Sequence, residues 1–209
     1  MSGGAPAPGG RPVEPAPATM GIDLRPLADH EVTVGVAVAV PEPHATRLRE
    51  HRRAFGDPLA DAVPPHVTLL PPTTVPSGRV DEVLEHLQRA AAATGPFTLS
   101  LRGTGTFRPV SPVVFVALAE GAAECGALER AVRRGPLERE LAFDYHPHVT
   151  VAHHVPDAAM DRALAELSDF EVDLAVDAFW LYRHGHDGVW RPYRRFRLVG
   201  DAAAAGGAA

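Results

Sequence analysis

The stretches PPHVTLLPP (64–72) and DYHPHVTVAHH (144–154) share the tetrapeptide Pro-His-Val-Thr. A short apolar run framed by prolines, as in the first stretch, is typical of a strand. Alternate residues of a strand lie on one face about 6.6–6.8 Å apart, so each tetrapeptide directs a histidine and a threonine to the same side. The four side chains concerned are His66, Thr68, His148 and Thr150.

The elements around the tetrapeptides also recur in the same order. A shift of 82 residues superimposes the two tetrapeptides. The accompanying matches are Val32 and Val34 with Val114 and Val116, VDEVLEHL (80–87) with MDRALAEL (160–167), and FTLSL (97–101) with FEVDL (170–174). This order predicts two β-α-β-α-β units, about 30–107 and 112–199, related by an approximate two-fold axis.

Hydrophobic periodicity indicates alternating strands and helices. Strands are predicted at 32–40, 65–70, 97–107, 112–118, 146–155, 170–183 and 189–199, and helices at 44–55, 80–94, 121–134 and 157–168. The mixture predicts an α+β fold in a single working domain over residues 30–199.

The two ends of the chain differ from this domain in composition. Residues 1–29 and 200–209 are dominated by Pro, Ala and Gly, and we expect both tails to be disordered. The opening MSGGAPAPGG lacks a basic and an apolar signal region, and no run approaches the roughly 20 apolar residues of a membrane span. We expect a cytoplasmic protein without membrane contact, and a domain of this size is compatible with a monomer.

All 20 residues in the combined Lys+Arg count are arginines. The lack of lysine excludes a P-loop phosphate anchor, a Schiff base and a lysyl-nucleotide intermediate. The single cysteine, Cys125, excludes an intrachain disulfide and a zinc site with several thiolates. A net charge of −6 argues against duplex nucleic acid, so any nucleic-acid substrate is small or is bound locally.

Two histidines on either side of one substrate suit phosphodiester cleavage. A neutral imidazole takes a proton from water while a protonated one gives a proton to the leaving oxygen, because an ordinary pKa near 6.5 allows both forms near neutrality. The threonine hydroxyls can donate to phosphoryl oxygens, where charge builds up in the transition state. This chemistry needs neither a metal nor a cofactor.

The sequence also allows two alternative functions. Three or more imidazoles could bind zinc or nickel, and the candidates are His146, His148, His154, His184 and His186. In the second alternative, the groove between the two tetrapeptides binds a cyclic phosphate or nucleotide without turning it over.

The paired tetrapeptides, FTLSLRGTGTF (97–107) with PVVFVAL (112–118), and the ending WRPYRRFRLV (190–199) resemble the two-histidine (2H) phosphoesterase superfamily. The similarity covers about residues 32–199 and points to the branch of 2'-5' RNA ligases and RNA 2',3'-cyclic phosphodiesterases. It implies a bilobal fold, two antiparallel sheets facing a central cleft with helices outside. It also implies hydrolysis of the 2',3'-cyclic phosphate of RNA ends or nucleotides to a 2'-phosphate, reversible as ATP-independent 2'-5' ligation. By the same analogy His148 is the base and His66 the acid, although nothing in the sequence orders them.

Substrate-binding residues are expected around this cleft. Many relatives carry an arginine three residues after the second threonine, where this chain has His153. The other candidates are Arg108, which follows Phe107 at a strand end, and Tyr182 and Arg183 before the HGHDG turn. In the last strand Arg191, Tyr193, Arg195 and Arg197 are expected to share a face, either an anion-binding wall or a solvated surface.

Overall fold

The computed structural model describes residues 28–200, so the predicted tails lie outside the described residues except for 28–29 and 200. The strands are β1 (Glu31–Ala39), β2 (His66–Pro76), β3 (Phe97–Thr106), β4 (Val113–Glu120), β5 (His148–His153), β6 (Glu171–Val176), β7 (Ala178–His184) and β8 (Trp190–Arg197). The helices are α1 (His44–Phe55), α2 (Val80–Ala92), α3 (Ala122–Val132) and α4 (Asp157–Glu166), with short 3-10 turns at Ser77–Arg79 and Gly135–Leu137. Among the described residues no helix is both long and apolar enough to cross a membrane.

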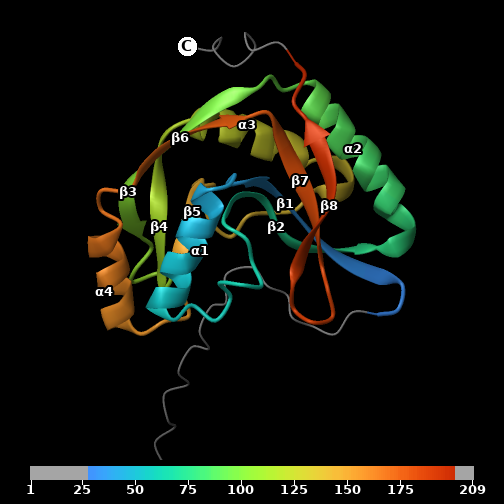
Figure 1. The fold of residues 1–209 in the computed structure, drawn as a ribbon. Helices are drawn as coiled ribbons and strands as arrows, with labels where there is room; N and C mark the ends of the chain where they lie inside the picture. Colours follow the sequence, from blue (N-terminus) through green and yellow to red (C-terminus); the bar gives the residue numbers. More distant parts are fainter. Residues whose placement is uncertain (1–27, 201–209) are drawn as a thin grey trace, which may run out of the picture.

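The strands form one curled sheet in the order β6-β3-β4-β5-β2-β1-β7-β8 (Figure 1). Every neighbouring pair is antiparallel, and β2 meets β5 through a single residue pair, Val67 with Val149. The sheet is therefore divided into two four-stranded lobes that join at the Pro-His-Val-Thr tetrapeptides. This agrees with the expected α+β bilobal fold, with the two halves continuous at one point.

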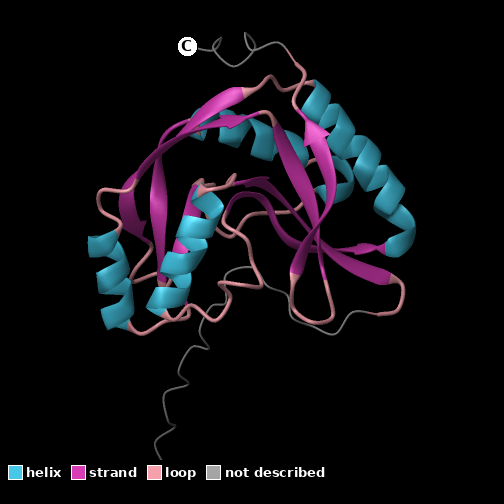
Figure 2. Ribbon diagram, in the orientation of Figure 1, coloured by secondary structure: helices cyan, strands magenta, loops and turns pink. Residues whose placement is uncertain are grey.

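Each lobe is covered by helices from both halves of the chain. Helices α1 and α4 contact each other and pack on β5, while α2 and α3 contact each other and pack on β8 and β2 (Figures 1 and 2). Their apolar faces and the buried face of the sheet form one hydrophobic core, with fully buried side chains such as Leu48, Leu87, Phe179 and Phe196. The helices thus lie outside the sheet, as expected.

The predicted strand 170–183 is two strands in different lobes. The strand ends before Asp177. The part before this residue, β6, pairs with β3, and the part after it, β7, pairs with β1. The segments 97–101 and 170–174 therefore lie side by side and not at equivalent positions, and β7 is the counterpart of β3 in the other lobe. A continuous alternation of apolar residues is the same whether a strand remains in one sheet or crosses over, so periodicity could not locate the break.

The alignment of the strands before the two tetrapeptides is also different from the prediction. Val38 pairs with Val67, and Val116 pairs with Val149. Val38 and Val116 are 78 residues apart, whereas the predicted shift was 82. An offset of four residues keeps every side chain on the same face, so the valine-rich pattern fits both registers.

Strand β2 is longer than the predicted 65–70 because it continues through Pro71 and Pro72. These prolines lie in an irregularity of the ladder, between the pairs Val36–Leu70 and Val34–Thr73. A bulge leaves residues without ladder partners, so the absence of two N–H groups costs no hydrogen bond there.

The loop that leads into His66 is held by a buried ion pair. Arg52, near the end of α1, donates from Nε to Asp57 Oδ2 at 2.9 Å and from a terminal nitrogen to the carbonyl of Val63 at 2.6 Å. The other Asp57 oxygen accepts the backbone N–H of Leu59 at 2.8 Å. The side chains of Arg52 and Asp57 are 4% and 0% exposed, so the charges compensate each other away from water.

Substitution of Asp57 by alanine is expected to destabilise the fold strongly. The change leaves the Arg52 guanidinium buried without its carboxylate, and breaking a buried pair from one side costs about 3–5 kcal/mol. Urea denaturation measures the loss. Asp61→Ala is the matched control, because Asp61 pairs with the neighbouring Arg53 in the same loop but is exposed. A shift of the midpoint no larger for Asp57→Ala than for Asp61→Ala would contradict the assigned role of the pair.

Candidate active site

The junction of β2 and β5 brings the two tetrapeptides together. Because Val67 and Val149 are directly opposite in an antiparallel pair, His66 lies beside Thr150 and Thr68 lies beside His148. The two valines are buried in the core, so all four polar side chains point to the other face of the sheet. The local two-fold symmetry of an antiparallel pair therefore supplies the predicted arrangement of His66, Thr68, His148 and Thr150.

Both imidazoles are fixed by the backbone two residues before them. His66 Nδ1 lies 2.7 Å from the carbonyl oxygen of Pro64, and His148 Nδ1 lies 2.7 Å from that of His146. A carbonyl oxygen only accepts, so each Nδ1 carries the hydrogen and the lone pair of the neutral ring is on Nε2. His66 Nε2 is 3.1 Å from Thr68 Oγ1 and accepts from that hydroxyl in the neutral form. Protons are thus gained and lost at Nε2 on both histidines.

Desolvation lowers the pKa of both histidines. Burial is the main cause for His148, whose pKa falls to about 4, and the neighbouring His66 and His146 lower it further. Burial also lowers the pKa of His66, and the charge of Arg52 acts in the same direction. Because each ring disfavours a proton on the other, the pair carries one proton more readily than two.

An aromatic wall surrounds His148. The ring centroids of Phe107 and Phe115 are 4.9 and 5.3 Å from that of His148 and 4.5 Å from each other. Gly105 accommodates this packing, since a Cβ there would lie 2.6 Å from the Phe115 ring. The sequence indicated Phe107 as a residue near the cleft but missed Phe115, whose position opposite Thr150 depends on strand register. This wall supplies much of the apolar surroundings of the histidine.

The segment that leads into His148 is anchored on β2. Tyr145 donates its hydroxyl hydrogen to the carbonyl of Thr68 at 2.9 Å. Arg139 donates to the carbonyl of Pro72 at 3.0 Å and to Thr73 Oγ1 at 3.1 Å. Each histidine is therefore preceded by a loop held by arginine, with Arg52 performing this role before His66.

The structure does not gather the predicted substrate-binding residues Arg108, Tyr182 and Arg183 at one place. Arg108 turns toward α4, where it pairs with Asp161 at 2.6 Å and Asp157 at 3.5 Å. Tyr182 and Arg183 are adjacent on β7, so they point to opposite faces, and the register puts Tyr182 on the histidine face. Tyr182 is buried, which raises the pKa of its hydroxyl. Arg183 stacks on the Tyr193 ring at 3.6 Å.

His153 lies on the same face as the catalytic candidates because of a bulge in β5. Thr150 pairs with Phe115 and His153 pairs with Val113, so one extra residue on β5 restores the alternation. The ring of His153 stacks on that of His154 with centroids 3.7 Å apart. Burial and the adjacent His154 lower the pKa of His153 to about 4. It is a neutral side chain near neutrality, unlike the arginine that many relatives carry at this position.

The histidines of the metal alternative are not assembled into a ligand set. The rings of His146 and His148 have centroids 6.3 Å apart, and His154 is stacked on His153. Across residues 28–200 there is no group of three or more His, Cys, Asp or Glu side chains arranged to hold a metal ion.

The expected face of the last strand is wrong for Arg191. Strand β8 has an irregularity at Tyr193, where Tyr182 pairs with Pro192 but Leu181 pairs with Arg194. The bulge reverses the alternation, so Arg191 lies on the face opposite to Arg195 and Arg197.

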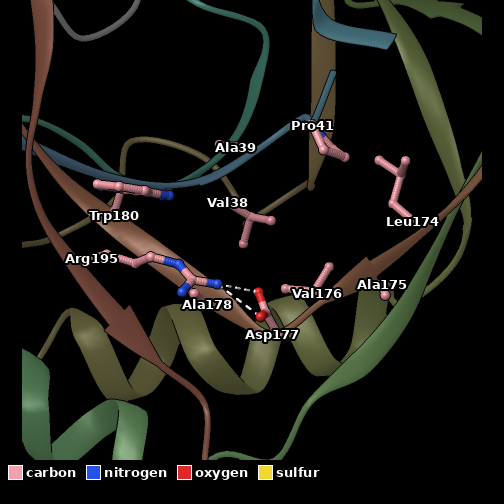
Figure 3. A pocket seen from close by; sticks show the side chains of 10 residues that line it. All are labelled: Val38, Ala39, Pro41, Leu174, Ala175, Val176, Asp177, Ala178, Trp180 and Arg195. Atoms are coloured by element: carbon pink, nitrogen blue, oxygen red, sulfur yellow. Dashed lines mark hydrogen bonds and ion pairs between the residues drawn. The ribbon is translucent and has the colours of Figure 1, made fainter. Parts of the chain in front are cut away.

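A pocket of about 220 Å³ lies at the end of β1, beside the crossing between β6 and β7 (Figure 3). Its lining includes Pro41, Leu174, Val176, Trp180 and Arg195, and Arg195 reaches toward Asp177. The sequence reasoning missed Trp180, which has no distinguishing motif around it.

Known proteins show the same combination of sequence and fold. A sequence model of the 2'-5' RNA ligase superfamily matches residues 40–188. A Bacillus cytotoxicus protein whose name assigns it provisionally as a phosphoesterase is 31% identical over 144 residues, which cover 68% of this chain and 83% of that protein.

Solved structures extend the likeness to the fold. Escherichia coli LigT complexed with 3'-AMP gives a TM-score of 0.60 at 21% identity, covering 80% of this chain and 98% of that one. The Thermus thermophilus protein TT0787 gives a TM-score of 0.53 at 26% identity, covering 81% of this chain and 99% of that one. The matched family, the paired tetrapeptides and the bilobal sheet together place the chain in the 2'-5' RNA ligase superfamily of two-histidine phosphoesterases.

Proposed function

We propose that the protein is a cyclic phosphodiesterase that hydrolyses a 2',3'-cyclic phosphate at an RNA end or on a nucleotide to a 2'-phosphate. The observation that carries this proposal is the convergence of two histidines and two threonines on one face at the β2–β5 junction. In the reaction, water forms a bond to phosphorus and the bond from phosphorus to the 3' oxygen breaks. One histidine takes a proton from the water, and the other protonates the departing 3' oxygen.

The assignment of His148 as the base and His66 as the acid follows the family analogy, because burial lowers the pKa of both rings. His148 has a pKa of about 4, so it is neutral and able to accept a proton at ordinary pH. His66 has a hydroxyl, Thr68 Oγ1, beside its Nε2. When His66 gains a proton, its Nε2 becomes a donor and the neighbouring charge further favours neutral His148. After one turnover the proton has moved from one ring to the other, and solvent exchange restores the starting state.

The threonines supply donors for the phosphoryl group. Thr68 and Thr150 lie on the histidine face, with Thr68 beside His148 and Thr150 beside His66. Their hydroxyls can donate to the non-bridging oxygens, on which negative charge increases in the transition state. The acid, the base and these donors account for the catalysis with no metal ion.

Nucleotide recognition and reversibility follow from the same site. LigT, which shares the fold, has been crystallised with 3'-AMP, and this supports a nucleotide or RNA end as the ligand of the cleft. If a 5' hydroxyl of RNA replaces water, the same acid and base give a 2'-5' phosphodiester, with energy from the strained cyclic phosphate and not from ATP. Since the chain lacks lysine, a lysyl-nucleotide route to ligation is excluded.

Removal of either histidine is expected to abolish most turnover. His66→Ala and His148→Ala should each lower kcat for 2',3'-cyclic AMP by about 10²–10⁴-fold, the usual contribution of a positioned acid or base. His186→Ala is the control, since His186 is exposed on the β7–β8 turn. Product release is measured by chromatography in buffer containing EDTA. Full activity in either variant would refute the acid–base pair, and binding without turnover by the wild type would favour the non-catalytic alternative.

The pH dependence of kcat/KM is expected to be bell-shaped and centred on the acid side of pH 6.5. The neutral base is lost as pH falls through the His148 pKa of about 4. The protonated acid is lost as pH rises through the His66 pKa, which burial lowers below its ordinary 6.5. Activity should therefore fall by about tenfold per pH unit well above that pKa. Initial rates at low substrate concentration across the range from about pH 4 to about pH 9 test this, and an optimum above about pH 7 would contradict it.

A further inference from the structure

The pocket beside Trp180 opens on the same face of the sheet as the two histidines. Thr68 pairs with Ala37, Ala37 pairs with Trp180, and Trp180 pairs with Arg195. Directly paired residues of adjacent strands point to the same face, so this continuous row extends from the catalytic threonine to Arg195. With neighbouring strands about 4.8 Å apart, the backbone of Trp180 lies about 10 Å from that of Thr68.

The lining of the pocket fits a flat aromatic ligand with polar edges. Trp180 is half-buried, and the exposed apolar residues Pro41 and Ala175 line the pocket with it (Figure 3). At the rim Arg195 donates from one terminal nitrogen to both oxygens of Asp177 at 2.8 Å. The pair cancels its own charge and presents both donors and acceptors. A nucleobase has this combination of a stacking surface and hydrogen-bonding edges.

An exposed arginine lies next to the pocket. Arg197 shares the histidine face with Arg195, two residues away along β8, and it pairs with the pocket residue Ala178. It is exposed, and within residues 28–200 it has no ion-pair partner. Arginine binds phosphate through parallel N–H donors, so this position suits a phosphate attached to a ligand in the pocket.

We propose that the Trp180 pocket holds the base of the terminal nucleotide and that Arg197 binds the phosphate on its 5' side. The inference rests on the proposed function, since it takes the cyclic phosphate to be the group between the two histidines. It makes the 5' phosphate the feature by which the enzyme distinguishes an RNA end from a simple nucleoside cyclic phosphate.

Binding of two product-like nucleotides tests the 5' phosphate directly. Calorimetry with adenosine 2'-phosphate and adenosine 2',5'-bisphosphate needs no turnover, so its result is independent of whether the protein is catalytic. The bisphosphate is expected to bind the wild type about tenfold more tightly, the scale of one charge-assisted hydrogen-bonded contact. Arg197→Gln should remove this advantage. Arg194→Gln should retain it, because Arg194 is exposed on the same strand but pairs with Leu181 on the other face.

Trp180 variants test the base pocket. Trp180→Ala is expected to weaken binding of both nucleotides by about tenfold through loss of stacking, and Trp180→Phe should restore most of it. The aromatic variant separates lost stacking from a damaged fold. Equal affinity of the wild type for the two nucleotides, or an advantage that survives Arg197→Gln, would overturn the inference about Arg197. Unchanged binding in Trp180→Ala would overturn the assignment of the pocket, whereas absence of turnover of 2',3'-cyclic AMP would count against the proposed function alone.

Discussion

The pairing of Val67 with Val149 is the constraint on which the site depends. It is the only residue pair that joins β2 to β5 in the described sheet, and it lies between the histidine and threonine of both tetrapeptides. Burial of the two valines in the common core turns the four polar side chains to the opposite face. An antiparallel pair has local two-fold symmetry, so one contact places each histidine beside the other strand's threonine. A displacement by one residue would direct the histidines into the core.

The exchange of elements between the lobes stabilises this junction. The crossing at Asp177 carries the chain from β6 in one lobe to β7 in the other, and each lobe has helices from both halves of the sequence. Neither half of the chain can complete its own lobe, because β3 and β7 both pair with strands of the other half. The two histidines are thus held by one continuous core, which restricts their relative motion.

Burial affects both the chemistry and the stability of the site. The apolar surroundings that lower the pKa of His148 come from packing, including Phe107 and Phe115, and neutral imidazole is the form that accepts a proton. The charges that are buried nearby, Arg52 and Asp57, are paired and hold the loop before His66. Backbone carbonyls fix the Nδ1 hydrogens, so reactivity is concentrated at Nε2.

The sequence by itself determined the elements and the family. Hydrophobic periodicity predicted the α+β fold. Repetition of Pro-His-Val-Thr predicted the convergence of His66 and His148, because alternation assigns residues to faces without knowledge of their partners. The sequence did not locate the end of the strand at Asp177, the register of β1 and β4, the bulge at Tyr193 or the positions of Phe115 and Trp180. Those features depend on which strands become neighbours and in what register, and shifts by an even number of residues leave the apolar pattern unchanged. Only the tertiary structure selected among them, because packing of the whole core favours a single register.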